Sequence, residues 1–97
     1  MQTWDLVING ETVGRLKLRE INQPWMECAF SPEPAFNPYA DTFYREARLL
    51  EAGDEQSWQA LFDQISVLDI ALTGSDGSVI NDPLLHINTQ QEARFRY

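Results

Sequence analysis

The stretch PWMECAFSPEPAFNPY, residues 24–39, separates a strand-rich beginning of the chain from a helical middle. Four of the five prolines lie between Pro24 and Pro38. Proline lacks the backbone N–H that regular structure needs, so residues 31–37 are expected to form a loop. The segment is also rich in large rings, and such an irregular segment is expected either to be pinned to a core or to line a binding site. Its rings are Trp25, Phe30, Phe36 and Tyr39.

Before this segment, apolar and polar side chains alternate, which is the period of a half-buried strand. Residues 3–8 follow this pattern, and the Asn9-Gly10 pair after them favours a tight hairpin turn. A return strand is predicted over residues 12–19 and a third strand over 25–30. Gly14 lies inside the return strand and indicates a β-bulge or a close approach of another part of the chain.

After this segment, the sequence predicts two helices. Asn37-Pro38 is typical of a helix N-cap followed by proline in the first turn, and Gly53 is typical of a helix end. Asp54 is placed to cap a second, shorter helix. The period of two then returns, and the last strand is predicted over residues 93–97. The buried stripe of the first helix is expected to contain Ala40, Phe43, Ala47 and Leu50.

These elements predict the α+β class. Strands grouped apart from helices are typical of a mostly antiparallel sheet, here of six or so strands in the order βββ-αα-βββ(β). The two helices are expected to pack on one face of that sheet. The length suits a single domain over residues 1–97.

Acidic residues dominate the charge: fifteen Asp and Glu stand against seven Lys and Arg, a formal net charge of -8. An acidic body repels nucleic acid but attracts a basic protein. The N-terminus lacks the basic start and apolar run of a signal peptide, no stretch is apolar enough for a membrane span, and Cys28 is a lone cysteine. A cytoplasmic protein is therefore expected, with neither nucleic acid nor a membrane as its partner.

The sequence lacks the patterns of common metal, cofactor and catalytic sites, so neither a metal nor a cofactor is expected. One histidine and one cysteine cannot supply a zinc site, and no phosphate-binding loop or dinucleotide fingerprint occurs. Cys28 and His86 would form a nucleophile–base pair only if the fold joined them. Burial of Cys28 with Met26 and Phe30, and a structural role for His86, are the favoured interpretations.

Basic side chains form one candidate binding site. Arg15, Lys17 and Arg19 project from one side of the return strand, and Arg94 and Arg96 project from the last strand. If these strands were neighbours, five cations would form a patch for an anion or an acidic partner. The favoured alternative is a sheet face on which cationic stems cover apolar surface.

Aromatic side chains form the other candidate. Trp25, Phe36 and Tyr39, with His86 nearby, are candidates to line a groove for a small apolar ligand or a side chain of a partner. The favoured alternative is that the rings seal the core beneath the proline-rich segment.

Single residues spread over the chain resemble a group of small bacterial proteins of uncharacterised function. The chain departs from that group at Asn22 and Cys28, where the group has Asp and Gly. The resemblance implies a compact single-domain fold and brings no activity with it. The residues that carry it are Trp4, Gly10, Gly14, Pro24-Trp25, Phe30, Phe36, Phe43, Leu85-His86-Ile87 and Ala93-Arg94-Phe95-Arg96.

The sequence therefore favours a non-enzymatic domain that binds another protein, similar in composition to immunity-type proteins, with a partner that is expected to be basic. The alternative is a small-molecule-binding protein or an enzyme with a cleft beneath residues 24–39. The last strand, over residues 93–97, ends the chain and is a candidate edge, through which strand pairing would give a homodimer.

Overall fold

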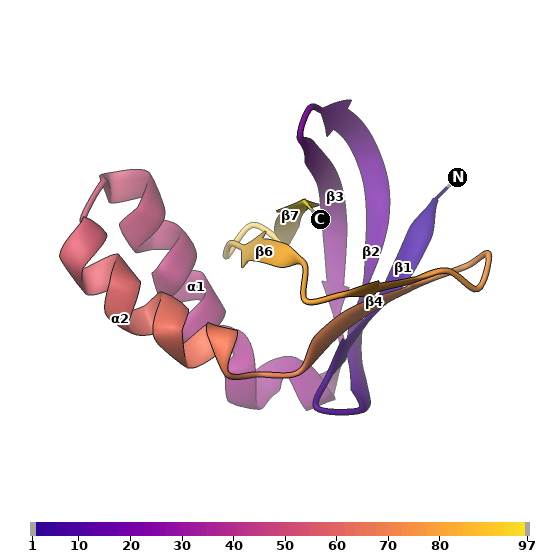
Figure 1. The fold of residues 1–97 in the computed structure, drawn as a ribbon, viewed down its shortest axis with the longest axis horizontal. Helices are drawn as coiled ribbons and strands as arrows, with labels where there is room; N and C mark the ends of the chain where they lie inside the picture. Colours follow the sequence, from indigo (N-terminus) through magenta and orange to yellow (C-terminus); the bar gives the residue numbers. More distant parts are fainter. Residues whose placement is uncertain (1, 97) are drawn as a thin grey trace.

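The chain folds as three strands, two α-helices and four further strands in a computed structural model that describes residues 2–96 (Figure 1). The predicted α+β class is confirmed. Over this range, neither helix combines the length and the apolar character that a membrane crossing requires. The elements are β1 (Thr3–Ile8), β2 (Glu11–Asn22), β3 (Trp25–Pro32), the 3₁₀ helix η1 (Pro34–Phe36), α1 (Asn37–Ala52), α2 (Glu55–Ser66), β4 (Ile70–Gly74), β5 (Val79–Asn81), β6 (Leu84–Ile87) and β7 (Glu92–Arg96).

The strands form one curled antiparallel sheet in the order β5-β4-β1-β2-β3-β7-β6. Both helices lie on the same side of it (Figure 1): α1 lies against β6, and α2 packs on α1. β6 is consequently covered on both faces. Leu85 and Ile87 point into the core, whereas His86 between them points to α1 and meets Glu46.

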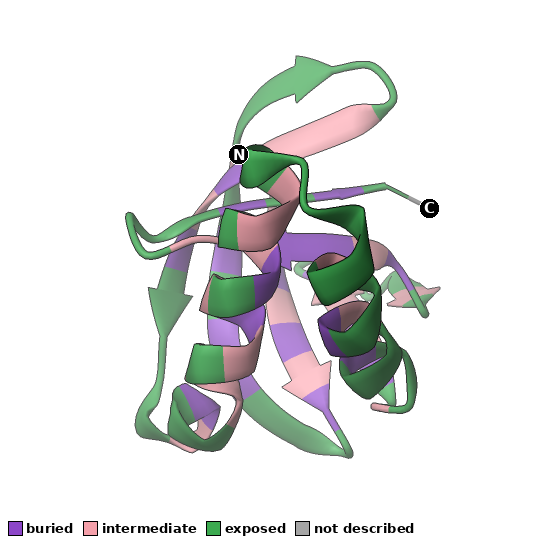
Figure 2. Cartoon of the chain, turned by 90° about the vertical axis from the view of Figure 1, so that its left-hand side faces the viewer, coloured by how far each residue is buried: buried purple, intermediate pink, exposed green. Residues whose placement is uncertain are grey.

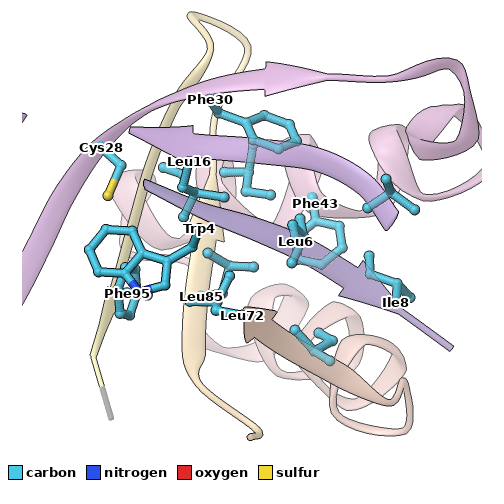
Figure 3. Close-up of a cluster of buried hydrophobic side chains, with 14 of the residues drawn as sticks. Trp4, Leu6, Ile8, Leu16, Cys28, Phe30, Phe43, Leu72, Leu85 and Phe95 are labelled. Atoms are coloured by element: carbon cyan, nitrogen blue, oxygen red, sulfur yellow. The ribbon is translucent and has the colours of Figure 1, made fainter. Parts of the chain in front are cut away.

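Alternate residues of the central strands fill the core (Figure 3). Trp4, Leu6 and Ile8 of β1 are buried, while the residues between them are only partly buried. The ring of Trp4 meets the ring of Phe95 edge-on, with 5.0 Å between the centroids, and Phe43 of α1 joins the same cluster. The alternation read from the sequence therefore determines which face of the sheet is buried.

Gly14 was predicted to mark either a β-bulge or a close approach, and the structure has a bulge beside it and a close approach at it. The register of β1 against β2 shifts beside it and leaves Val13 as the extra residue of a β-bulge. A Cβ atom on Gly14 would lie only 2.6 Å from Cε1 of Phe30 and 2.9 Å from the carbonyl oxygen of Ser31. Only glycine lets β3 and the Phe30 ring lie so close to this strand.

Three of the four predicted helix-end features are borne out. Gly53 ends α1 with a left-handed φ of 75°, and the Asp54 carboxylate caps α2 by accepting a hydrogen bond from the Ser57 N–H at 3.2 Å. Proline also lies in the first turn of α1, as expected. The prediction that Asn37 caps α1 is wrong, because η1 leads directly into the helix and makes Phe36 the N-cap.

The prediction of a loop over residues 31–37 is also wrong. β3 continues to Pro32, and η1 begins at Pro34. At the end of a strand or in the first turn of a helix, the backbone N–H is not needed for the regular hydrogen bonds, so proline fits both positions.

β5 and the pair formed by β6 and β7 lie at opposite ends of the sheet. β5 pairs with β4 at one edge of the sheet, whereas β6 pairs with β7 at the other. Asp82, with a left-handed φ of 50°, lies in the connection between them. β7 lies between β3 and β6, so the prediction that the last strand is an edge of the sheet is wrong. A homodimer through an edge strand stays a prediction, and Tyr97, included in the predicted last strand, lies outside the described residues.

Candidate functional site

A cleft of about 710 Å³ lies between α1 and the strands β2, β3, β7 and β6. α1 contributes Leu50 and Glu51 to its lining, and the sheet contributes mostly charged side chains. Four of the lining side chains from the sheet occupy one row, since they pair side by side across the four strands. Side chains paired in this way point to the same face of the sheet. In the order of the strands, the row is Glu20, Glu27, Arg94 and His86.

A buried polar network supports the end of this row. The Glu46 side chain from α1 has no exposed surface, and its Oε1 lies 2.9 Å from Nδ1 of His86. The indole N–H of Trp58, from α2, donates a hydrogen bond to Oε2 of the same carboxylate. The network therefore joins both helices to β6. His86 lines the cleft and uses Nδ1 for Glu46, so Nε2 is the ring nitrogen that remains for an occupant of the cleft.

The role of Glu46 was missed from the sequence, although the sequence carries a signal for it. Glu46 lies three residues after Phe43 and four before Leu50, on the stripe expected to be buried. A carboxylate at a core position is costly unless it is hydrogen-bonded, so its presence there indicates a partner. The sequence does not identify that partner, because His86 lies forty residues away in the chain.

Trp25 adjoins the cleft through His86, and the centroids of the two rings are 5.5 Å apart. Two guanidinium groups lie over the indole face: that of Arg94 at 4.7 Å from the ring centroid and that of Arg96 at 5.6 Å. These cation–π contacts keep the two arginines against Trp25.

The structure does not assemble the predicted patch of five cations. β3 separates β2 from β7, so the two strands that carry the cations are not neighbours. Arg15 turns toward β1 and forms an ion pair with Asp5 at 3.2 Å, and Lys17 is exposed on β2. Arg19 and Arg94 are the two cations of the set that line the cleft.

The structure also does not bring the three candidate aromatic residues together in a groove. Phe36 is 1% exposed, and its ring packs on those of Phe30 and Phe43, with centroids 4.9 Å and 5.8 Å apart. Tyr39 is partly buried against the same core, whereas Trp25 adjoins the cleft. Phe36 and Tyr39 thus seal the core, which was the favoured alternative.

Cys28 and His86 do line the same cleft. The thiol is nevertheless buried, and its burial, followed by the nearby charge of Glu27, raises the pKa of Cys28 to about 12. The thiolate is the nucleophilic form of cysteine, so Cys28 is a poor nucleophile at neutral pH. Within residues 2–96, no three His, Cys, Asp or Glu side chains are grouped to hold a metal ion.

The charges that line the cleft are unbalanced. Its lining contains four glutamates but two arginines. In the described part of the chain, no ion pair within 4 Å involves any of these glutamates. Glu27 accepts a hydrogen bond from the Asn22 amide at 3.1 Å. The four glutamates are Glu20, Glu27, Glu51 and Glu92.

No family model, curated protein or solved structure matches this chain. The resemblance to small bacterial proteins therefore stays a prediction, and arguments about function depend on the geometry of the cleft.

Proposed function

We propose that this chain is a cytoplasmic, non-enzymatic domain that binds a basic protein, and that the cleft beside α1 receives cationic side chains of that partner. The observation that carries the proposal is the set of four cleft glutamates, none of which forms an ion pair with another residue of the range 2–96. Carboxylates around a concave surface are complementary to lysine and arginine side chains.

The charge of the whole chain supports the same partner class. Between residues 20 and 82, twelve acidic residues stand against two bases, Arg45 and Arg48. Such a distribution attracts a basic protein over a distance and raises its association rate. The outward sides of both helices are largely exposed (Figure 2). They extend the acidic surface beyond the cleft through Asp41, Glu55 and Asp63.

Charge reversal inside and outside the cleft tests the proposal. The probe is poly-lysine, and its affinity is measured by calorimetry at about 50 mM NaCl. Reversing two cleft charges, by Glu27→Lys with Glu92→Lys, should weaken binding by at least about tenfold. The matched control reverses two exposed charges of α2, by Glu55→Lys with Asp63→Lys, and changes the net charge equally.

The control variant should bind more tightly than the cleft variant, because general attraction is reduced equally in both while only one loses the cleft. Equal weakening in the two variants would refute a role for the cleft. If the cleft is the site, a basic protein isolated from the source cells should bind the wild type with defined stoichiometry and bind the cleft variant weakly.

A small-molecule-binding protein or an enzyme is the second candidate, and the orientation of His86 by buried Glu46 favours it. A carboxylate that fixes a histidine is a common arrangement around general bases. If His86→Ala and Cys28→Ser abolished a measured turnover while the fold was retained, this second function would replace the first.

A further inference from the structure

We infer that Nε2 of His86 is a hydrogen-bond acceptor for a primary ammonium group, so that the cleft recognises a lysine side chain in particular. This inference rests on the proposed function, because it names the group of the basic partner that enters the cleft.

The Glu46 network favours one tautomer of the His86 ring. The indole N–H of Trp58 is a donor only, so Oε2 of Glu46 is an acceptor. An ionised carboxylate has no proton to give, and the proton between Oε1 and Nδ1 then lies on Nδ1. In the neutral ring, the lone pair is therefore on Nε2.

Nε2 is open to the cleft. The His86 side chain is 7% exposed, and His86 is one of the residues that line this cleft. In residues 2–96, no hydrogen bond reaches Nε2, and no buried side-chain nitrogen or oxygen lacks a partner. The ring thus has one nitrogen fixed by the core and one available to an occupant.

The surrounding groups favour a cation with several donors. An anion at Nε2 would enter a cleft whose lining holds four glutamates against two arginines. Arg94, the cation paired with His86 across β6 and β7, has its guanidinium over the Trp25 ring. Of the four cleft glutamates, Glu92 already accepts a hydrogen bond from the Asn88 amide at 3.0 Å.

The acceptors also favour ammonium over guanidinium. His86 lies on β6, Glu92 begins β7, and Glu51 lies on α1 on the opposite wall. An ammonium group donates in three divergent directions, whereas the planar guanidinium fork suits acceptors on one side.

The lone histidine makes the direct test unambiguous, since a long-range ¹H–¹⁵N spectrum contains the signals of a single ring. The wild type should show protonated Nδ1 and unprotonated Nε2. n-Butylammonium should shift the Nε2 signal, whereas acetate and guanidinium at the same ionic strength should shift it much less. A protonated Nε2 in the neutral ring, or a larger shift with acetate, would overturn the inference.

Two variants separate recognition from stability. Trp58→Phe keeps a ring in α2 but removes the donor to Glu46, and the second tautomer should become detectable. His86→Phe with Glu46→Leu removes the acceptor without leaving a buried carboxylate unpaired. This double variant should bind n-butylammonium at least about tenfold more weakly than the wild type. Unchanged affinity in the folded double variant would overturn the inference.

Poly-lysine distinguishes this inference from the proposed function. Suppose that the cleft variant, Glu27→Lys with Glu92→Lys, loses poly-lysine binding, whereas His86→Phe with Glu46→Leu keeps it fully. The cleft then binds basic proteins without His86, and the inference alone fails. If the cleft-reversed and α2-reversed variants bind poly-lysine equally, the proposed function fails as well.

Discussion

At position 46, a helix with an ordinary amphipathic pattern carries a carboxylate into the core. Glu46 is fully buried, yet both of its oxygens have hydrogen-bonding partners, one on β6 and one on α2. Such a group contributes little net stability while it is paired, but its removal leaves buried donors without an acceptor. One residue therefore determines how His86 and Trp58 are held.

Glu46→Ala should lower the free energy of unfolding by about 3 kcal/mol, because His86 and Trp58 lose their acceptor inside the core. Urea denaturation measures the loss. Glu51→Ala on the same helix is the control and should change stability little, since Glu51 is exposed. An unchanged stability of Glu46→Ala would contradict a structural role for the pair.

Cys28 predicts a pH dependence. Its folded pKa of about 12 lies above the ordinary value of 9.0, so the folded state holds the thiol proton more tightly than the unfolded state. Its contribution to stability is complete below pH 9 and is lost as the pH rises toward 12. Between about pH 8 and about pH 10.5, the wild type should lose about 2 kcal/mol more than Cys28→Ala. Urea titrations at both values test this, and parallel losses in the two proteins would rule it out.

At the scale of elements, local signals predicted most of the secondary structure. Alternation predicted the first hairpin, and Gly53 and Asp54 predicted the junction between the helices, because these features depend on a few adjacent residues. The predictions failed where a residue type suits two roles. Pro34 is compatible with a loop and with the start of η1, and only packing of Phe36 in the core favours the second.

Gly14→Ala should destabilise the sheet, because the new methyl group would overlap the Phe30 ring and the Ser31 carbonyl. Overpacking of this kind costs about 2 kcal/mol, or about 10 °C in Tm for a domain of this size. Thr12→Ala, at an exposed position of the same strand, is the control for thermal denaturation. Adding Phe30→Leu to Gly14→Ala should recover part of the lost stability. If Gly14→Ala alone had the Tm of the wild type, β3 would move aside without a measurable cost, and the prediction would be wrong.

At the scale of the whole molecule, strand order brings the cleft residues together. Glu27 and Arg94 meet because β7 pairs with β3, and His86 joins them because β6 pairs with β7 rather than continuing from β5. The individual strands are readable from their period, but their partners are chosen by long-range packing that one sequence does not display. The candidate residues His86, Arg19 and Arg94 were therefore predictable by type, whereas their common cleft was not.

The net charge of -8 is also a property of the whole chain, and it opposes folding because the compact state brings like charges together. Salt screens exposed charges separated by more than about 10 Å at about 0.1 M, so moderate salt should stabilise this protein. Between about 10 mM and about 300 mM NaCl, Tm should rise by about 5 °C, which corresponds to about 1 kcal/mol for a domain of this size.

Thermal denaturation at several salt concentrations measures this rise. Glu55→Gln with Asp63→Asn removes two exposed negative charges of α2 and should reduce the salt dependence, since less repulsion is left to screen. Binding of a basic partner should respond in the opposite direction and weaken over the same salt range, because salt screens its attraction to the cleft as well. A Tm that stays constant or falls with salt would mean that the acidic residues are already neutralised in the fold, and the attraction of a basic partner would then lose its physical basis.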